Sequence, residues 1–147
     1  MMTIEVPFTA NDNTIAAPCY AHDGDAGIDL RSTIDCVIQP FERVLIPTGV
    51  SFAIPEGYAG FVVPRSGLAV NHGISIVNAP GLIDSGYRGE IKVILINMDS
   101  NKPFEIKTGD RIAQLVFTPY AHALLKQLPS LDITERGEKG FGSSGVS

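Results

Sequence analysis

The sequence predicts a single all-β domain, from its turn residues, its short apolar runs and its length. The 147 residues include 15 glycines and 10 prolines. Together they make up about 17% of the chain, against roughly 12% in average usage. These turn residues separate short runs rich in Val, Ile, Phe and Tyr, which is the pattern of a β sandwich or barrel. A chain of this length leaves little room for a second domain.

The expected strands are the apolar runs between the turns. A helix is disfavoured for them because Gly or Pro interrupts nearly every window of roughly eleven residues. Four consecutive apolar residues, VILI at 93–96, predict a strand covered on both faces. One short helical turn is expected at 66–71, with Ser66 capping its first backbone amides. The expected strands span residues 34–38, 43–46, 50–54, 58–63, 92–97 and 111–117.

Composition and charge exclude several function classes. Hydrophobic residues make up 44% of the chain and charged residues 18%, which is enough apolar surface for a core. The net charge of −5 argues against binding nucleic acid through a basic face. No apolar run approaches the roughly 18 residues of a membrane helix, and the start MMTIEVPF lacks the features of a signal peptide. We therefore expect a cytoplasmic protein with no nucleic-acid or membrane partner.

The cysteines and histidines do not suggest a metal site or covalent catalysis. Cys19 and Cys36 are too few for a disulfide framework, and both are expected to be small buried hydrophobes. His22, His72 and His122 lack the spacing of metal ligands. Neither residue type supports a covalent mechanism.

The last twelve residues, RGEKGFGSSGVS at 136–147, combine glycines with an aromatic residue and an arginine. GFGSSG matches GxGxxG, but it opens no strand–helix–strand unit, so a Rossmann site is rejected. Backbone amides without Cβ obstruction can still surround an anion. Arg136 can bind phosphate oxygens in a fork, Phe141 can stack on a base, and Ser143 and Ser144 add hydroxyl donors. The segment indicates either a flap over a phosphate-bearing ligand or a frayed terminus.

Two further segments suit phosphate or metal binding. PRSGLA would place Arg65 and Ser66 at a helix N-terminus, where free amides favour an anion. The alternative is a surface arginine beside a capping serine. DAGIDLRS contains Asp29, and carboxylates suit Mg²⁺. The alternative for this segment is a turn followed by a strand acid.

A third segment suits the positioning of a general base. NAPGLIDSGYRGEI at 78–91 predicts a strand, a Ser-Gly turn and a returning strand. Asp84 and Tyr87 could then face one cavity, where a carboxylate can activate water, unless Asp84 only stabilises the turn. Arg111 and Gln114 are long polar residues on an otherwise apolar expected strand, which indicates either a satisfied polar network or a ligand contact.

The order of these segments resembles a known family more specifically than any one of them does. DAGIDLRS, PRSGLA, GLIDSGYRGEI, GDRIAQLV and RGEKGFGSSG are similar to the five ordered motifs of the trimeric dUTPase family, the deoxyuridine 5′-triphosphate nucleotidohydrolases. The resemblance runs from residue 25 to 145. It implies a jelly-roll-like β barrel over residues 1–135 and a flexible Gly-rich C-terminal arm over 136–147. It further implies a homotrimer with active sites between subunits, over which the arms close.

The resemblance also implies roles for individual positions. Asp84 resembles the general base that deprotonates the attacking water, and Tyr87 the residue that stacks under the deoxyribose and rejects ribonucleotides. Asp29 resembles the acid that supports Mg²⁺ through bound water. The other substrate-binding positions are Asn78, Gly81 and Ile83 at the base, Arg65, Ser66, Gly67 and Gln114 at the phosphates, and Arg136, Phe141, Gly142, Ser143 and Ser144 in the arm.

The implied reaction is Mg²⁺-dependent hydrolysis of dUTP to dUMP and pyrophosphate, by attack of water on the α-phosphorus. It would limit uracil in DNA and supply dUMP for dTMP synthesis. One competing interpretation is a dCTP deaminase, which shares the fold and an Arg-Ser phosphate segment, but GLIDSGYRGE argues against it. Another is a non-catalytic jelly-roll module, which would not need Asp84, Tyr87 and the tail motif together.

Overall fold

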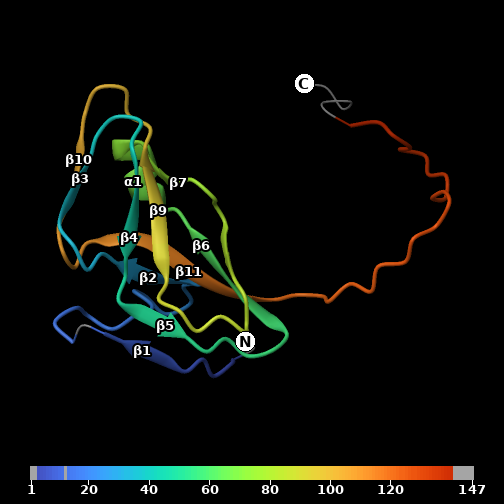
Figure 1. The fold of residues 1–147 in the computed structure, drawn as a ribbon, viewed down its shortest axis with the longest axis horizontal. Coiled ribbons are helices and arrows are strands. Elements are labelled where there is room, and N and C mark those ends of the chain that lie inside the picture. The colour runs from blue at the N-terminus through green and yellow to red at the C-terminus, as the bar shows by residue number, and fades with distance from the viewer. Residues whose placement is uncertain (1–2, 12, 141–147) are drawn as a thin grey trace.

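The described part of the chain contains eleven strands and one short helix (Figure 1). The computed structural model describes residues 3–11 and 13–140. The prediction of an all-β domain is confirmed. In chain order the elements are β1 (Phe8–Ala10), β2 (Gly27–Arg31), β3 (Cys36–Ile38), β4 (Arg43–Pro47), β5 (Val50–Phe52), β6 (Tyr58–Val63), α1 (Ser66–His72), β7 (Ile74–Ile76), β8 (Gly81–Ile83), β9 (Lys92–Asn97), β10 (Phe104–Ile106) and β11 (Arg111–Pro119).

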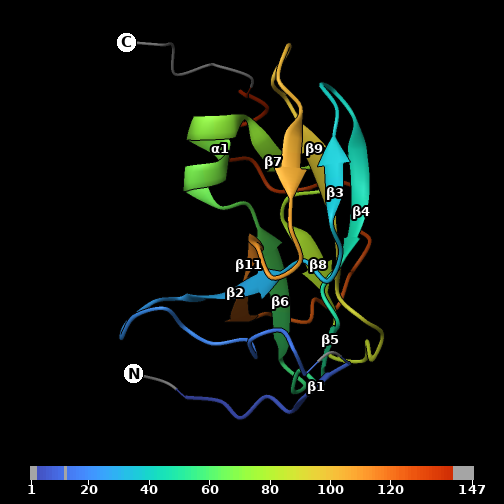
Figure 2. The ribbon, with the colours of Figure 1, turned by 90° about the vertical axis from the view of Figure 1, so that its left-hand side faces the viewer.

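The strands form small antiparallel sheets whose neighbours are mostly distant in sequence. The largest sheet has the order β2-β11-β6-β8, and a second has the order β4-β9-β7. β1 pairs with β5, and β10 pairs with β3. The nine-residue β11 lies between β2 and β6, and Figure 2 shows α1 to one side of the strands. Such crossing connections are typical of a jelly-roll-like fold and differ from a series of simple hairpins.

The core lies between the sheets and is almost entirely aliphatic. Along β2, Ile28 and Leu30 are buried while Asp29 and Arg31 are not, as the two-residue period of a strand requires. Burial of one such aliphatic side chain contributes about 1.5–3 kcal/mol. The other large side chains that are fully buried include Ile38, Ile46, Ile54, Ile74, Ile91, Leu95, Ile106, Ile112 and Leu115.

The outer face of the β4-β9-β7 sheet carries several apolar side chains that are only partly covered. In β9, Val93 and Leu95 are buried whereas Ile94 and Ile96 are half-buried. Leu45, the partner of Ile94 on β4, is 54% exposed. The prediction that residues 93–96 are covered on both faces is therefore wrong for this chain alone, because the described residues leave the second face partly open to solvent.

The start of α1 also differs from the prediction. The N-cap residue is Arg65, and no side chain caps the first amides. The predicted capping role of Ser66 is wrong because Ser66 is already the first helical residue, one position beyond the one from which a side chain caps. Gly73 ends the helix at a φ of 66°, with its amide directed at the carbonyls of Leu68 and Ala69. No helix in the described ranges is both long and apolar enough to cross a membrane.

The two cysteines have different environments. Cys36 in β3 is half-buried, and burial raises the pKa of its thiol. Cys19 is exposed, so the prediction that both are buried is wrong at this position. Cys19 lies in the segment between β1 and β2, outside the strands that enclose the core.

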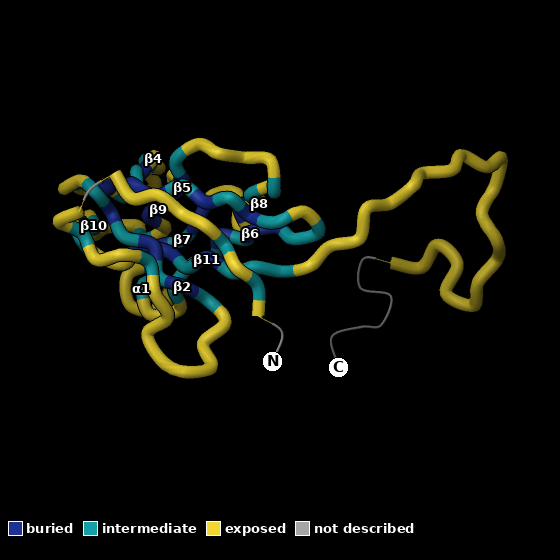
Figure 3. The backbone as a smooth tube through the Cα atoms, turned by 90° about the horizontal axis from the view of Figure 1, so that it is seen from below, coloured by how far each residue is buried: buried dark blue, intermediate teal, exposed yellow. Residues whose placement is uncertain are grey.

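Beyond β11 the chain leaves the domain. We refer to residues 3–119 as the domain and to residues 120–140 as the tail. Residues 121–140 contain no helix or strand and are exposed throughout. Figures 1 and 3 show them running away from the sheets. The tail therefore gains nothing from the core of its own chain.

Candidate functional site

Residues 81–91, which we call the Asp84 loop, form no hairpin. β8 pairs with β6 on the large sheet, and no strand returns beside it within the described residues. A tight turn follows β8, closed by the Tyr87 amide, which donates to the Asp84 carbonyl oxygen at 3.1 Å. The predicted returning strand is wrong because the chain after the turn bonds to the start of β5 instead: the Ile91 amide donates to the Val50 carbonyl oxygen at 2.8 Å.

Asp84 and Tyr87 line the same cavity, which has a volume of about 360 Å³. Ile83 contributes to its wall from the end of β8, and Glu90 and Lys92 contribute from the other end of the loop. Tyr87 is 45% exposed, so part of its ring remains open to a ligand. A carboxylate beside an open aromatic ring is suited to hold a water next to a bound sugar.

Asn78 and Gly81 lie beside this cavity. They line a smaller one, of about 50 Å³, which shares part of its wall with the first. Gly81 is buried, and a Cβ there would lie 3.4 Å from the Val62 side chain and 3.5 Å from Asn78 Nδ2. A side chain larger than a methyl group at position 81 would therefore displace Asn78.

A second group of polar residues surrounds Asp29. The Asp29 Oδ1 atom lies 3.3 Å from Arg65 Nε, and Oδ2 lies 3.4 Å from Arg111 Nη1. Arg65 also donates from Nη1 to the Arg111 carbonyl oxygen at 3.2 Å. The Asp29 side chain is only 11% exposed, whereas the Arg65 and Arg111 side chains are more open. Guanidinium N–H groups that face outward in this way can bind phosphate oxygens.

Gln114, Ser66 and Gly67 flank the same residues. Gln114 lies on β11 directly opposite Asp29 and is half-buried. Ser66 and Gly67 follow Arg65 in the first turn of α1 and are exposed. The structure thus brings together the predicted phosphate-binding residues that lie outside the arm. We call Asp29, Arg65, Arg111 and Gln114 the Asp29 group.

Arg111 is a member of this group to which the motif resemblance assigns no role. Its sequence signal is its place as a long polar residue on an otherwise apolar strand, which usually indicates a satisfied polar network and has a ligand contact as the alternative. The structure contains the network, because Arg111 holds one carboxylate oxygen of Asp29 while Arg65 holds the other.

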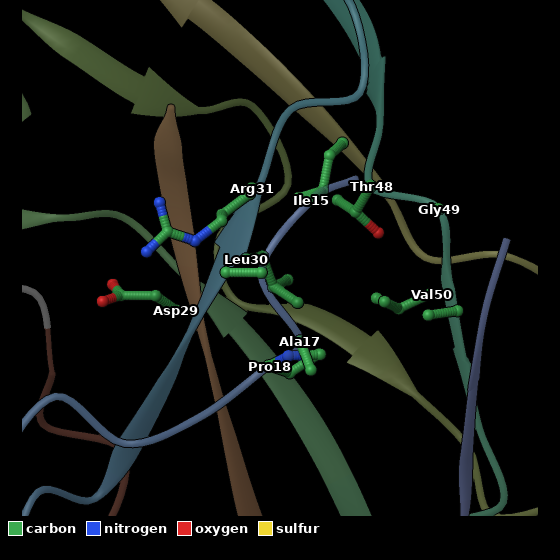
Figure 4. Close-up of a pocket in the computed structure, with 11 residues that line it drawn as sticks. Ile15, Ala17, Pro18, Asp29, Leu30, Arg31, Thr48, Gly49 and Val50 are labelled. Atoms are coloured by element: carbon green, nitrogen blue, oxygen red, sulfur yellow. The ribbon is translucent and has the colours of Figure 1, made fainter. Parts of the chain in front are cut away.

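Figure 4 shows which side of β2 carries this chemistry. The Asp29 carboxylate and the Arg31 guanidinium project to one side of the strand, and the Leu30 side chain projects to the other. The cavity that Leu30, Thr48 and Val50 help to line has a volume of only about 10 Å³, far below that of a small-molecule site. This small cavity therefore cannot hold a nucleotide, and the Asp29 carboxylate faces the outward side of β2 instead.

Asp29 fits a role as an outer ligand of Mg²⁺ better than a place in a closed metal site. The Asp29 side chain is 11% exposed, and its Oδ1 atom makes an ion pair with Arg65 without accepting a hydrogen bond from the described residues, so the carboxylate keeps acceptor capacity for a metal-bound water. The same residues contain no cluster of three or more His, Cys, Asp or Glu side chains that could hold a metal ion. A single carboxylate still suits Mg²⁺, because this ion keeps several waters and takes further ligands from substrate phosphates.

The Asp29 group and the Asp84 loop lie apart on the large sheet. Ile83, next to Asp84, is opposite Gly60 of β6, whereas Gln114 is opposite Val63. The step from Gly60 to Val63 corresponds to about 10 Å along β6, and the two strand spacings from β8 to β11 correspond to about 10 Å across the sheet. The cavity beside the Asp29 group shares no lining residue with the cavity beside Asp84.

The part of the arm that the structure describes, residues 136–140, lies apart from both the Asp29 group and the Asp84 loop. Arg136 is exposed in the tail, where its Nε donates to the Lys139 carbonyl oxygen at 3.2 Å. Figure 1 shows the tail leading away from the sheets that carry both groups. The predicted contacts of Phe141, Gly142, Ser143 and Ser144 lie outside the described residues.

A comparison of the sequence with models of known protein families shows to which family the chain belongs. The dUTPase family model matches residues 13–145. The chain belongs to the dUTPase family. The match includes the Asp29 group, the Asp84 loop and the tail.

Curated relatives agree with this family membership. A protein of Leifsonia xyli subsp. xyli is 52% identical over 145 residues, which cover 99% of this chain and 93% of the relative. A protein of Cutibacterium acnes is 55% identical over 132 residues, which cover 90% of this chain and 87% of the relative. Both relatives are named deoxyuridine 5′-triphosphate nucleotidohydrolase. This dUTPase is therefore an enzyme that hydrolyses dUTP.

Solved structures of dUTPases share the fold. The dUTPase of Staphylococcus bacteriophage 80alpha with dUPNHPP has a TM-score of 0.89 at 33% identity, covering 98% of this chain and 100% of that one. A mutant dUTPase from phage phi11 of S. aureus, described with a structural Mg(II) ion, has a TM-score of 0.80 at 26% identity, covering 88% and 100%. The jelly-roll-like β fold that the sequence predicts is confirmed.

Proposed function

We propose that this enzyme cleaves dUTP to dUMP and pyrophosphate by attack of water on the α-phosphorus, with Mg²⁺ bound to the substrate phosphates. The observation that carries the proposal is the cavity that Asp84 and the partly exposed Tyr87 line together. Family membership supplies the substrate, and this cavity supports the choice of the base.

Asp84 is the proposed general base. Its carboxylate orients one water and accepts a proton from it. The water oxygen bonds to the α-phosphorus as the bond from that phosphorus to the bridging oxygen breaks, and the electron pair leaves with pyrophosphate. Phosphoryl transfer depends on positioning and charge neutralisation more than on covalent help, so the chain needs no nucleophilic side chain.

The Asp29 group is the proposed triphosphate site. Arg65 and Arg111 offer guanidinium N–H groups, and Gln114, Ser66 and Gly67 add uncharged donors. Mg²⁺, when bound, would neutralise phosphate charge, and Asp29 would hold it through a water. The ion pairs of Asp29 with Arg65 and Arg111, which place its carboxylate beside the proposed phosphate-binding groups, support this role.

The Asp84 loop and its neighbours are the proposed nucleoside site. Asn78 and the backbone of Gly81 and Ile83 would bind the uracil, because they lie beside the cavity that contains Asp84. Tyr87 would stack under the deoxyribose. A ring in that place leaves no room for a 2′-hydroxyl, so UTP would be rejected.

We further infer that the active enzyme is a homotrimer whose sites lie between subunits. The distance between the Asp29 group and the Asp84 loop supports this arrangement, because two subunits could bring together what one chain holds apart. The partly open apolar face that includes Leu45 supports it as well. Arms from the subunits would close over the sites, with Phe141 stacked on uracil and Arg136, Gly142, Ser143 and Ser144 holding the γ-phosphate.

The proposed reaction has two consequences for a cell. Removal of dUTP limits the incorporation of uracil into DNA, and the dUMP that is formed supplies dTMP synthesis. The cytoplasm is the proposed location, because both the substrate and the product belong to the pool of free nucleotides.

Release of pyrophosphate from dUTP, dTTP, dCTP and UTP, each with and without Mg²⁺, tests the proposal. We expect rapid release from dUTP alone, and only with Mg²⁺. Release of ammonia from dCTP with no pyrophosphate from dUTP would instead indicate a deaminase, and no product from any nucleotide would indicate a non-catalytic module. The mass of the enzyme in solution by light scattering tests the trimer separately.

A further inference from the structure

The ring of Tyr87 is held by its own loop although much of it is exposed. The Tyr87 hydroxyl donates to the Glu90 carbonyl oxygen at 3.0 Å, and the Tyr87 amide donates to the Asp84 carbonyl oxygen at 3.1 Å. The backbone of Tyr87 and the far end of its side chain are therefore both bonded within the same short loop. The ring folds back over the residues that separate Tyr87 from Glu90.

Gly89 is what permits this position of the ring. A Cβ built on Gly89 would lie 2.6 Å from Tyr87 Cζ and 3.0 Å from Cε2, and closer still to the hydroxyl oxygen. Such distances are far inside van der Waals contact. The φ of Gly89 is outside the left-handed region, so the backbone itself would accept alanine. The requirement for glycine therefore comes from the tyrosine ring.

The acceptor of the Tyr87 hydroxyl is itself fixed by the connection between β4 and β5. The Glu90 Oε1 atom accepts a hydrogen bond from the Gly49 amide at 2.8 Å. The next residue, Ile91, accepts one from the buried Thr48 hydroxyl at 2.6 Å and donates one to Val50 at 2.8 Å. The Glu90 carbonyl thus stands on a rigid part of the domain.

We propose that Gly89 and Glu90 are positioning residues for Tyr87 that set the selectivity of the enzyme for deoxyribose over ribose. Gly89 provides the space in which the ring lies, and Glu90 supplies the carbonyl that fixes its hydroxyl. A ring excludes a 2′-hydroxyl only if it cannot yield, so a shift of the ring would admit ribose. This inference rests on the proposed stacking of deoxyribose on Tyr87.

The loop offers a matched control for Gly89. Gly86 lies in the same loop, has no atom within 4 Å of a built Cβ, and also has φ outside the left-handed region. Gly89→Ala and Gly86→Ala therefore make the same chemical change, and only the first meets the ring. We expect Gly89→Ala to lower the ratio of kcat/KM for dUTP to that for UTP by roughly tenfold, and Gly86→Ala to change it by less than about twofold.

Glu90 can be tested with a conservative pair. Glu90→Gln keeps a side-chain oxygen that can accept from the Gly49 amide, whereas Glu90→Ala removes it. We expect Glu90→Ala to lower the dUTP to UTP ratio and Glu90→Gln to retain it. A purely structural role would lower activity on both nucleotides together and leave the ratio unchanged.

The position of the ring can be followed without any substrate. The chain has four tyrosines, so ¹⁹F NMR of the 3-fluorotyrosine-labelled protein gives few signals, and Tyr87→Phe assigns the one from Tyr87. We expect Gly89→Ala to shift that signal and Gly86→Ala to leave it in place. An unchanged signal together with an unchanged nucleotide ratio in Gly89→Ala would overturn the inference. A wild-type enzyme that hydrolyses dUTP and UTP equally would contradict the proposed role of Tyr87 instead.

Discussion

The domain and the tail use the same apolar residue types in opposite ways. In the domain, Leu30 and Leu115 are at most 1% exposed. In the tail, Leu124 and Leu125 are more than 90% exposed. Each buried leucine contributes about 1.5–3 kcal/mol to folding, and the tail leucines forgo this contribution in the single chain.

This difference indicates that the tail binds something other than the core of its own chain. A segment that only separates an arm from a domain would need polar residues, and this segment carries several large apolar ones, Leu124, Leu125, Leu128, Leu131 and Ile133. Exposed apolar residues on a described segment are characteristic of an interaction surface. The proposed trimer provides a partner for them, and the following predictions separate the roles of domain and tail.

The largest expected effect is loss of the proposed base in the domain. Asp84→Asn should lower kcat by about 10²–10⁴-fold, the usual contribution of a general base, because the amide cannot take the proton of the attacking water. Binding of dUTP, measured by calorimetry, should persist because Asn preserves the shape of the side chain. A kcat within about twofold of the wild-type value would show that the chemistry does not depend on Asp84.

Removal of the arm should have the next largest effect. Deletion of residues 136–147 should lower kcat/KM for dUTP by about 10²-fold, because the site would no longer close and exclude water. The melting temperature should not change, since the described part of this segment is exposed. Full turnover by the shortened enzyme would refute the proposed closure.

A matched pair of leucine substitutions should separate the two regions by stability. Leu30→Ala should lower the free energy of unfolding by about 2–5 kcal/mol, because it leaves a cavity in the core. Leu125→Ala makes the same change in the tail and should leave the unfolding of the dilute, dissociated chain unaltered. It should weaken subunit association instead, measured by sedimentation. Equal losses in urea unfolding of the dilute chains would show that the tail packs on its own domain.

The smallest expected effect is that of replacing Asp35, an exposed residue of the domain whose carboxylate accepts two hydrogen bonds. The amide and hydroxyl of Thr108 donate to Asp35 Oδ1 at 2.7 and 2.9 Å, and these bonds hold the pKa of Asp35 below its ordinary value of 3.8. Such a group contributes stability above its unfolded pKa and loses it as the pH falls through its folded pKa. Asp35→Ala should therefore lower the melting temperature slightly at pH 7. The difference from wild type should shrink below pH 3.8, and a difference that grows in acid would contradict this account.

The longer strands could be predicted from sequence because each carries its own pattern. The runs at 58–63 and 92–97 have the bounds of β6 and β9, and the helical turn at 66–71 differs from α1 by one residue. The three-residue strands β1, β7 and β10 were not predicted. A run of three residues is too short to show the alternation by which a strand is recognised in a sequence.

Two predicted local structures, in the Asp84 loop and at the start of α1, are wrong. Residues after the turn in the Asp84 loop were expected to pair with β8, but Ile91 bonds to Val50 instead. The prediction for Ser66 is that its side chain caps the helix, but α1 begins at Ser66 itself, so the capping position falls on Arg65. A distant segment decides against the predicted structure in the Asp84 loop, whereas at Ser66 the difference is a shift of one residue in the start of the helix.

The fold class, the family and the residue types that the chemistry requires follow from local patterns and from the order of motifs. Which side chains share a site depends on the tertiary structure. The register of β2, β11 and β6 brings Asp29, Arg65 and Arg111 together, and the bonds of residues 90–91 to the start of β5 fix the ring of Tyr87 over Gly89. Contacts of this kind depend on distances between segments far apart in the chain, and no local pattern encodes such distances.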